Sequence, residues 1–357
     1  MIKEYKPFVQ ETLGDALSLV RERFPESAVD IVRQALQNPC LKDGGSSGAI
    51  GYKNGVPVAF QMEMPRLLYC GQIKMNGLVG GMTCKTLKGC PLSVLLETLE
   101  KSYGIATIDT VFFGNSCCKA TEQIDELGGS MVGPESCTRF LWRAVRPLEC
   151  AAYFVRRKMF KARLPSWKEF STLSSAEYEV KRGEIVVRRL MVVKPEFFGV
   201  LMAEYLKTNE GLVCSRTAEE VEWIFGERIK NGQCVLLGAF KEGNPIGYII
   251  LRTNETAKRW SIHDWFAIKN DEKVLDLLLC ETCAYITKAT PAMMLEVCGF
   301  PTWAQRLLKR YLPFERPIGH NVFSWGSNDK SFREAVLPII DSRKSWFFGP
   351  YDGDICM

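Results

Sequence analysis

Hydrophobic positions recur along the chain in two patterns, one with the spacing of an amphipathic helix and one with the alternation of a strand. The segments 8–24 and 28–37 carry apolar residues at every third or fourth position and predict helices. The segment 51–60 places two apolar runs around a Lys-x-Gly turn and predicts a β-hairpin whose second strand is entered through Pro57. The pattern therefore predicts a mixed α/β protein.

The hairpin pattern occurs twice. Residues 51–60 read GYKNGVPVAF and residues 239–248 read AFKEGNPIGY, so that Lys53 and Lys241 correspond and lie 188 positions apart. Both segments have an apolar strand, a Lys-x-Gly turn and a second strand that begins near Pro. Self-similarity at a fixed offset indicates a repeated structural unit.

The elements around the two hairpins match in order and spacing. Two helical patterns precede each hairpin, and a strand, an apolar helix, a strand, a short helix and a final strand follow it. The further elements expected are helices 196–207 and 217–230 (the latter opened by a capping box from Thr217 to Glu220), strands 72–84 and 259–268, helices 91–103 and 273–288, and strands 106–113 and 292–297. Each unit is therefore predicted to run β-α-α-β-β-β-α-β-α-β.

The repeated pattern stops after a strand predicted over 138–145. This gives a first domain of residues 1–147, a basic helix and linker over 148–183, and a second domain of residues 184–357, which agrees with the usual size of domains. The linker contains a basic run from Arg156 to Arg163. We interpret this run first as the solvated face of a helix, with RNA or an acidic lipid surface as alternative partners.

Composition favours a cytoplasmic protein with a sizeable core. The chain has 357 residues, 46% of them hydrophobic, and no apolar stretch of the roughly 20 residues that a membrane span needs. The charged N-terminus does not resemble a signal peptide. A net charge of +5 suits an anionic ligand but lacks the dense basic stripe of a nucleic-acid-binding protein.

The 14 cysteines lie mostly within apolar runs, which indicates buried thiols rather than disulfides. Cys280 and Cys283 form a single Cys-x-x-Cys pair, and the chain has only two His, so we expect no metal site. Cys84 and Cys90 stand near the predicted start of helix 91–103, where a helix N-terminus would lower a thiol pKa. Either could be a nucleophile, although core packing is the preferred interpretation of Cys84.

Short motifs accompany the repeated element order. They are Leu295-Glu296-Val297, Ala304 and Leu312-Pro313-Phe314 in the second copy, and Val111, Asn115, Ala120 and Leu127-Gly128-Gly129 in the first. Together with the strand-helix-strand crossing in each unit, they resemble the GNAT (Gcn-related N-acetyltransferase) superfamily over nearly the whole chain. The resemblance implies an α/β (α+β) fold of two tandem GNAT-like domains, each a mixed, mostly antiparallel central sheet flanked by helices.

The resemblance also implies a cofactor, acetyl-CoA or another acyl-CoA, as co-substrate and no metal. In that family two central strands separate around the pantetheine arm, and the pyrophosphate lies on the N-terminus of the next helix. The loop 85–91 keeps one glycine of the family's phosphate-binding motif, whereas 269–273 has none and would bring two carboxylates against the phosphates. We therefore expect the cofactor in the first copy. The residues expected to bind it are Cys84, Lys85, Lys88, Gly89, Cys90 and Asn115.

Transfer of an acyl group from a thioester to an amine needs a base for the amine proton and an acid for the thiolate. Carboxylates on the central strands are the candidate bases: Asp264 and Glu296 could converge in the second copy, and Glu63 is the nearest equivalent in the first. A structural hydrogen bond is the alternative for each, and Glu63 could instead point to solvent. Ile124 and Lys309 stand where the family often supplies a Tyr as the acid.

The sequence thus predicts an acyl-CoA-dependent N-acyltransferase, with acetyl transfer from acetyl-CoA to a small amine as the leading reaction. One alternative is an aminoacyl-tRNA-dependent peptidyl transferase of the tandem-GNAT type, which the basic linker fits, although the chain lacks a long helical-hairpin insertion. The other is a catalytically inactive GNAT-fold binding or scaffold protein, which the missing Tyr and glycines favour.

Overall fold

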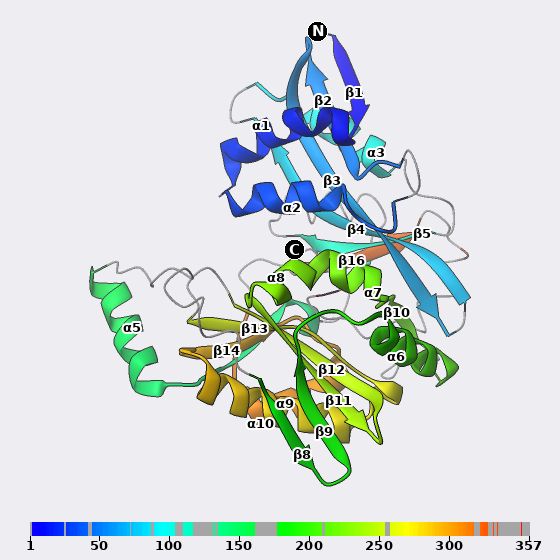
Figure 1. Cartoon of the computed structure of the whole chain (residues 1–357). Helices are drawn as coiled ribbons and strands as arrows, with labels where there is room; N and C mark the ends of the chain where they lie inside the picture. The colour runs from blue at the N-terminus through cyan, green and yellow to red at the C-terminus, as the bar shows by residue number, and fades with distance from the viewer. Residues whose placement is uncertain are drawn as a thin grey trace.

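The computed structural model contains two mixed sheets of eight strands each, flanked by helices (Figure 1). It describes residues 2–24, 26–41, 45–71, 73–86, 89–103, 110–116, 131–132, 135–160, 177–208, 211–253, 258–317, 322–327, 331, 334 and 351. Each sheet is mostly antiparallel and has one parallel pair among the described strands, β4 with β5 and β13 with β14. The predicted fold class is confirmed.

The first sheet has the order β1-β2-β3-β4-β5-β16-β6, and β10 adds to β3. Its strands are β1 (Lys3–Pro7), β2 (Gly48–Lys53), β3 (Val56–Cys70), β4 (Ile73–Lys85), β5 (Thr110–Ser116), β6 (Met131–Val132), β10 (Leu212–Cys214) and β16 (Val322–Ser327). Helices η1 (Gln10–Thr12), α1 (Leu13–Arg23) and α2 (Ser27–Ala35) accompany it, with α3 (Leu92–Tyr103). The hydroxyl of Tyr52 in β2 donates a hydrogen bond to Asp15 of α1, whereas the neighbouring Gly51 lies against Thr98 of α3. Helices α1 and α3 therefore cover opposite faces of the first sheet.

The second sheet has the order β15-β7-β14-β13-β12-β11-β9-β8. Its strands are β7 (Arg139–Ala144), β8 (Glu179–Arg182), β9 (Ile185–Leu190), β11 (Cys234–Lys241), β12 (Asn244–Thr253), β13 (Arg259–Ala267), β14 (Met294–Cys298) and β15 (Phe314–Pro317). The remaining helices are η2 (Glu135–Thr138), α5 (Pro147–Phe160), α6 (Pro195–Thr208), α7 (Ala218–Val221), the π-helical turn η4 (Glu222–Gly226), α8 (Glu227–Lys230), η5 (Ile268–Asn270), α9 (Glu272–Ala289), η6 (Thr302–Ala304) and α10 (Gln305–Tyr311).

The two hairpins share their turn geometry and their irregularity. Asn54 and Gly55 both have positive φ (51° and 78°), as do Glu242 and Gly243 (52° and 81°), which is the type I′ turn that matches the twist of the flanking strands. A register shift falls between Gly51 and Tyr52 in the first hairpin and between Ala239 and Phe240 in the second. These are corresponding positions, so the hairpins match residue by residue.

The described strands cross between the halves: the first half gives β7 to the second sheet, and the second half gives β10 and β16 to the first sheet. We predicted 138–145 as the last strand of the first unit, and β7 forms there, but it lies between β14 and β15 of the second sheet. In return β16, from the other end of the chain, lies between β5 and β6 of the first sheet (Figure 1). The assignment of this strand to the first sheet was wrong, because its hydrophobic pattern predicts a strand but not its neighbours.

The apolar core is continuous across both halves. One cluster of buried side chains contains Val29 and Phe60 from the first half as well as Phe225 and Trp265 from the second. At the junction, the indole N–H of Trp223 donates a hydrogen bond to the carbonyl of Gln34 (2.7 Å). The division into domains at residues 147 and 184 stays a prediction, and the sheets do not separate along it.

Candidate cofactor site and the junction between the halves

The two central strands of the first sheet, β4 and β5, separate along part of their length. β4 and β5 pair in parallel only where 76–79 faces 110–113. Beyond Val79, within the described residues, β4 continues to Lys85 without a ladder to β5, while β5 pairs with β16 along its other edge. Asn115, one of the predicted cofactor-binding residues, lies in this separated part of β5, opposite Phe323 of β16.

The loop from β4 to α3 leads from this gap to a helix N-terminus. Gly89 has φ +95°, a conformation that favours glycine, and a Cβ there would meet nothing within 4 Å. Val94 makes the first backbone hydrogen bond of the helix, to the carbonyl of Pro91 (3.0 Å), so the amides of Leu92 and Ser93 precede the hydrogen-bonded turn. Such N–H groups suit an anion.

Basic side chains surround this loop. Arg23 of α1 donates to the carbonyls of Lys85 (3.0 Å) and Thr86 (3.4 Å), and Lys53 of β2 donates to the carbonyl of Gly89 (3.3 Å). The side chain of Lys85 is exposed at the end of β4. Lys88 lies outside the described residues, as do Ala120, Ile124 and the Leu127-Gly128-Gly129 motif.

The thiols near this loop are not activated. Burial raises the pKa of Cys84 to about 12, with the charge of Arg23 acting in the opposite direction. Burial also raises the pKa of Cys90, against the lowering effect of Lys85 and Lys53. Loss of hydration therefore outweighs the positive surroundings at both thiols, and their pKa is raised rather than lowered. The charges of Lys85 and Lys53 still lower the pKa of Cys90, which indicates that both lysines lie near this thiol.

The corresponding place in the second sheet has different surroundings. β13 and β14 pair only where 259–262 faces 294–297, and β13 then continues to Ala267. The indole of Trp265, on this unpaired part, is fully buried and stacks on Trp303 of η6 with ring centroids 6.2 Å apart. The carboxylate of Asp271 accepts hydrogen bonds from the amides of Lys273 (2.8 Å) and Val274 (3.4 Å) at the start of α9. The chain's own carboxylate thus occupies the helix N-terminus at which an anion would bind in the second half.

Glu63 is the predicted carboxylate that lies beside the first gap. It faces Gly80, the first residue of β4 beyond the β5 pairing, and it sits at a register shift in β3. Its side chain is fully buried rather than directed to solvent. Its Oε1 accepts hydrogen bonds from the amide of Gln61 (2.7 Å) and the hydroxyl of Ser102 in α3 (3.4 Å).

Glu296 is held by two arginines in the second sheet. Arg259 donates to both of its carboxylate oxygens (2.6 and 2.8 Å), and Arg316 of β15 reaches Oε2 at 3.3 Å. The hydroxyl of Ser261, its neighbour across the parallel pair, also contacts it at 3.2 Å. Glu296 of β14 therefore links β13 with the edge strand β15.

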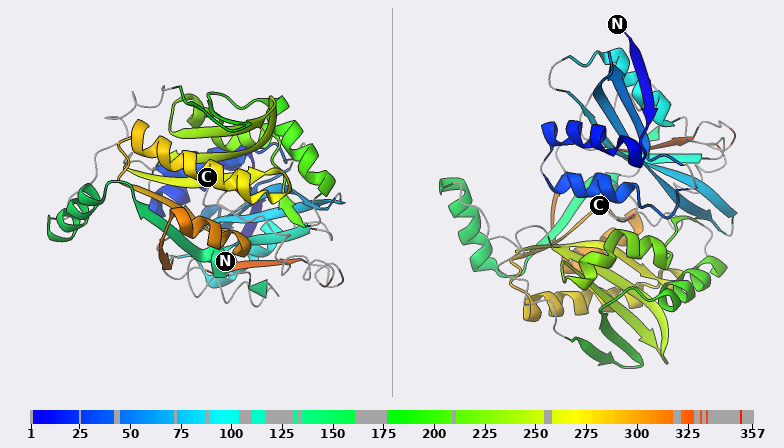
Figure 2. Two further views of the ribbon diagram at one scale, coloured as in Figure 1. Left: turned by 90° about the horizontal axis from the view of Figure 1, so that it is seen from below. Right: turned by 45° about the horizontal axis from the view of Figure 1, so that its top comes forward.

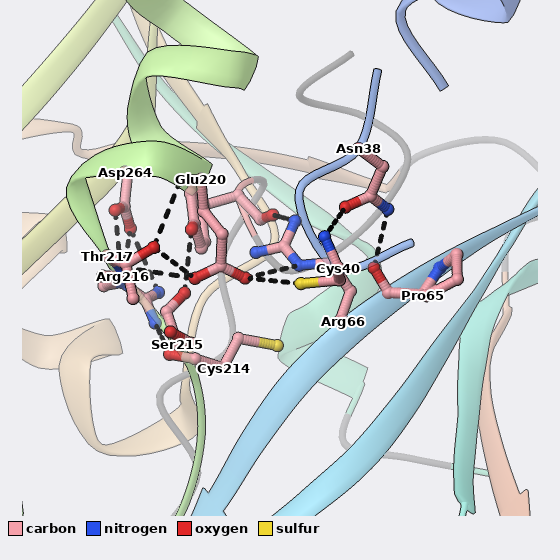
Figure 3. A network of polar contacts seen from close by, with 11 residues as sticks. Asn38, Cys40, Pro65, Arg66, Cys214, Ser215, Arg216, Thr217, Glu220 and Asp264 are labelled. Carbon is pink, nitrogen blue, oxygen red and sulfur yellow. Dashed lines mark hydrogen bonds and ion pairs between the residues drawn. The ribbon is translucent and has the colours of Figure 1, made fainter. Parts of the chain in front are cut away.

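Asp264 is held in a different place, at the junction of the halves (Figure 3). Arg216 contacts both of its oxygens at 3.1 to 3.3 Å, and Tyr248 of β12 donates its hydroxyl to Oδ2. The side chains of Asp264 and Arg216 are 0% and 1% exposed. No described contact joins Asp264 to Glu296, so the structure does not bring these two candidate bases together.

A second buried ion pair connects the halves directly. Arg66 of β3 lies 3.8 Å from Glu220 of α7, with both side chains 3% exposed. The thiol of Cys40 contacts the same carboxylate at 3.4 Å (Figure 3), and burial followed by the charge of Glu220 raises its pKa to about 12. The other oxygen of Glu220 completes the predicted capping box with Thr217, which is confirmed.

Tyr351, near the end of the chain, lies between the two arginines of this network. The guanidinium of Arg66 lies 4.4 Å from the centre of its ring and that of Arg216 lies 4.6 Å away, while its hydroxyl donates to the carbonyl of Ser215 (2.8 Å). Sequence reasoning found Glu220 only as a helix cap and missed Arg66, Arg216 and Tyr351. An arginine within an apolar segment is the signal that could have indicated Arg66 and Arg216.

No metal position and no membrane span emerge within the described part of the chain. There, no three His, Cys, Asp or Glu side chains gather in a way that could hold a metal ion. None of the described helices combines the length and apolar character that crossing a membrane requires.

Comparison with known proteins gives matches in structure alone. Searches against protein-family models and against curated protein sequences found no match. Saccharomyces cerevisiae N-myristoyltransferase with bound myristoyl-CoA and inhibitors is similar over 90% of this chain and 80% of its own, with a TM-score of 0.55 and 14% identity. A GCN5-related N-acetyltransferase from Kribbella flavida is similar over 94% of this chain and 73% of its own, with a TM-score of 0.59 and 11% identity. A probable N-acyltransferase from Enterococcus faecalis is similar over 93% and 74%, with a TM-score of 0.57 and 11% identity.

These similarities define the fold as that of acyl-CoA-dependent N-acyltransferases. They span nearly the whole chain, so both sheets take part in the match. The chain has, more particularly, the GNAT fold in a form with two GNAT-like sheets, and the resemblance predicted from the sequence is confirmed at the level of the fold.

Proposed function

We propose that the protein is an N-acyltransferase that binds acyl-CoA in the first half, with acetyl-CoA as the leading donor and a small amine as the acceptor. The observation that carries the proposal is the contrast between the two gaps. The gap between β4 and β5 leads to a glycine loop with basic neighbours, whereas in the second half the carboxylate of Asp271 caps the corresponding helix N-terminus. An anionic cofactor therefore has a place in the first half and meets a carboxylate in the second.

The residues divide into two roles in this proposal. Lys85, the Gly89 loop and the first amides of α3 bind the pyrophosphate, and the separated part of β5 at Asn115 faces the pantetheine arm. Glu63 is the proposed base, because its side chain is buried and it faces Gly80, the first residue of β4 beyond the β5 pairing. A carboxylate in this position can accept the amine proton.

Calorimetric titration of the full-length protein with acetyl-CoA, CoA and myristoyl-CoA tests the donor. We expect one equivalent to bind, and the order of affinities identifies the acyl chain. Lys85→Ala is expected to weaken binding about tenfold or more, as for loss of a charge-assisted contact. Lys273→Ala, an equally exposed lysine at the start of α9, is the matched control and is expected to bind normally.

The glycine loop has its own test. Gly89→Asp brings a carboxylate and backbone strain to the proposed phosphate site and is expected to abolish CoA binding. Gly243→Asp, at φ +81° with equally open surroundings, imposes the same strain in a distant turn and is the control. If both variants bind alike, the cofactor site does not lie at the Gly89 loop.

The base is tested by turnover. Glu63→Gln is expected to lower the rate of acyl transfer by about 10²- to 10⁴-fold while the dissociation constant for acetyl-CoA stays unchanged. Unchanged turnover in this variant would remove Glu63 from the mechanism.

A binding or scaffold protein that retains the fold without turnover is the second candidate. Lys309 of α10, where the family often has its Tyr acid, lies 2.6 Å from Glu315 in an ion pair. Tight CoA binding with no transfer to any of a broad set of amines would favour this candidate. Retention of aminoacyl-tRNA at moderate salt, without CoA binding, would instead favour the tRNA-dependent transferase.

A further inference from the structure

Helix α5 extends away from the body of the protein. In Figures 1 and 2 it stands apart from both sheets in every view, at the side where β7 leaves the second sheet. Only its beginning is packed: Cys150 is buried with Met293 and Met294, and Tyr153 is packed against this cluster. The rest of the described helix carries exposed apolar side chains.

The first turn is fixed to the second half by hydrogen bonds. Arg146, just before the helix, donates to the carbonyls of Thr290 (2.7 Å) and Ala292 (2.5 Å). Glu149 lies 3.6 Å from Lys258 and 3.7 Å from Arg146 in ion pairs. The helix is therefore held at its base in a defined direction.

Four of the exposed apolar residues form a stripe along α5, whereas Phe154, which is 44% exposed, lies on another side of the helix. Leu148, Ala152, Val155 and Met159 are spaced by four, three and four positions, which places them on one face of a helix. Leu148 is 87% exposed, Val155 is 55% exposed and Met159 is 68% exposed. Large apolar side chains at such exposure are unfavourable in water unless something covers them.

Basic residues border this stripe on both sides. With about 100° between successive residues, Arg156 and Lys158 project about 80° to either side of the direction of Leu148. Both side chains are exposed. The sequence adds Arg157 within the helix and Lys161 and Arg163 directly after it.

We propose that α5 is a membrane-surface anchor that lies on anionic phospholipid, with the apolar stripe in the interface and the flanking cations at the headgroups. An apolar stripe bordered by lysine and arginine is the arrangement that binds such a surface, because long basic side chains extend to the phosphates while the stripe enters the acyl boundary. Nucleic acid would use the cations but would leave the apolar stripe in water. The helix is too short to span a bilayer, so the contact is peripheral.

Flotation with vesicles tests this inference on the full-length protein. We expect binding to vesicles of phosphatidylcholine mixed with phosphatidylglycerol, weak binding to pure phosphatidylcholine, and a decrease with added salt. The variant Leu148→Gln/Val155→Gln/Met159→Gln keeps helix-favouring residues and is expected to reduce partitioning at least about tenfold. The variant Arg156→Gln/Lys158→Gln is expected to lose about tenfold at low salt.

Two controls carry matched changes elsewhere. Met191→Gln/Val192→Gln/Val200→Gln removes three apolar residues that are 42 to 43% exposed, and Lys181→Gln/Lys194→Gln removes two exposed lysines. Both are expected to bind vesicles as the wild type does, and circular dichroism and thermal unfolding check that every variant folds. Equal losses in the control and α5 variants, no binding of the wild type to anionic vesicles, or retention of tRNA in place of vesicles would each overturn the proposal. None of these outcomes depends on CoA binding.

Discussion

The substitution Asp264→Asn separates a structural role from a catalytic one. Asp264 and Arg216 are almost completely buried and are joined by three hydrogen bonds, with Tyr248 as a further donor. Replacing the carboxylate by an amide removes the counter-charge of Asp264 from the buried guanidinium of Arg216. Removing one partner of a buried ion pair costs about 3–5 kcal/mol, a large fraction of the roughly 5–15 kcal/mol that a folded protein has.

Urea unfolding at neutral pH measures this loss as a shift of the midpoint at constant slope. Glu296→Gln is the matched control, because its partners Arg259 and Arg316 are 30% and 46% exposed and water can hydrate them. We expect this control to lose only about 1 kcal/mol. The double variant Asp264→Asn/Arg216→Met also removes the buried guanidinium and is expected to recover part of the stability that the single variant loses.

The reasoning would be refuted by an Asp264→Asn protein with wild-type stability. If such a protein also lost acyl transfer while it still bound acetyl-CoA, Asp264 would return as a catalytic residue. A purely catalytic role of Asp264 would not explain a recovery of stability in the double variant. Comparing the single and double variants therefore distinguishes a structural role of Asp264 from a catalytic one.

Two further predictions follow from single residues. Burial lowers the pKa of His263 well below 6.5, so the folded protein excludes a proton that the unfolded chain binds, and stability should fall by about 1.4 kcal/mol per pH unit below 6.5 until the lowered pKa is reached. His263→Phe should flatten this dependence in urea midpoints measured above and below pH 6.5, and an unchanged slope would contradict the assignment. Thr217→Ala removes the confirmed N-cap of α7 and should cost about 1 kcal/mol in the same assay, whereas no loss would mean that Glu220 alone fixes the turn.

Local patterns in the sequence predicted the elements well. The Lys-x-Gly turns, the capping box at Thr217 and the helix 273–288 depend on neighbouring residues, and the structure has each of them close to the expected bounds. The neighbours of β7 and β10 depend on residues more than 100 positions away, and the pattern within each strand is the same for any pairing. The exchange of strands could not be predicted for this reason.

The candidate site stays a prediction. The choice of the first copy as the cofactor-binding half came from the glycine and the charges of two loops. What the sequence could not provide was the surroundings of each carboxylate: Asp264 and Glu296 look alike in their strands, and only the fold reveals that arginines from other elements hold them. Glu63 was expected to be a weaker candidate, yet it is buried beside Gly80.

The exchanged strands also determine when the first sheet can be completed. Most chains fold their N-terminal part while the ribosome still makes the rest, but here β5 lacks its neighbour until β16, at Val322–Ser327, has been synthesised. The proposed cofactor gap borders β5, so the nascent first half has an open sheet edge and an incomplete proposed site until β16 has been synthesised. A stop codon anywhere between β5 and β16 would therefore impair the proposed cofactor site of the N-terminal half, and a fragment that ends at residue 147 is not a substitute for that half.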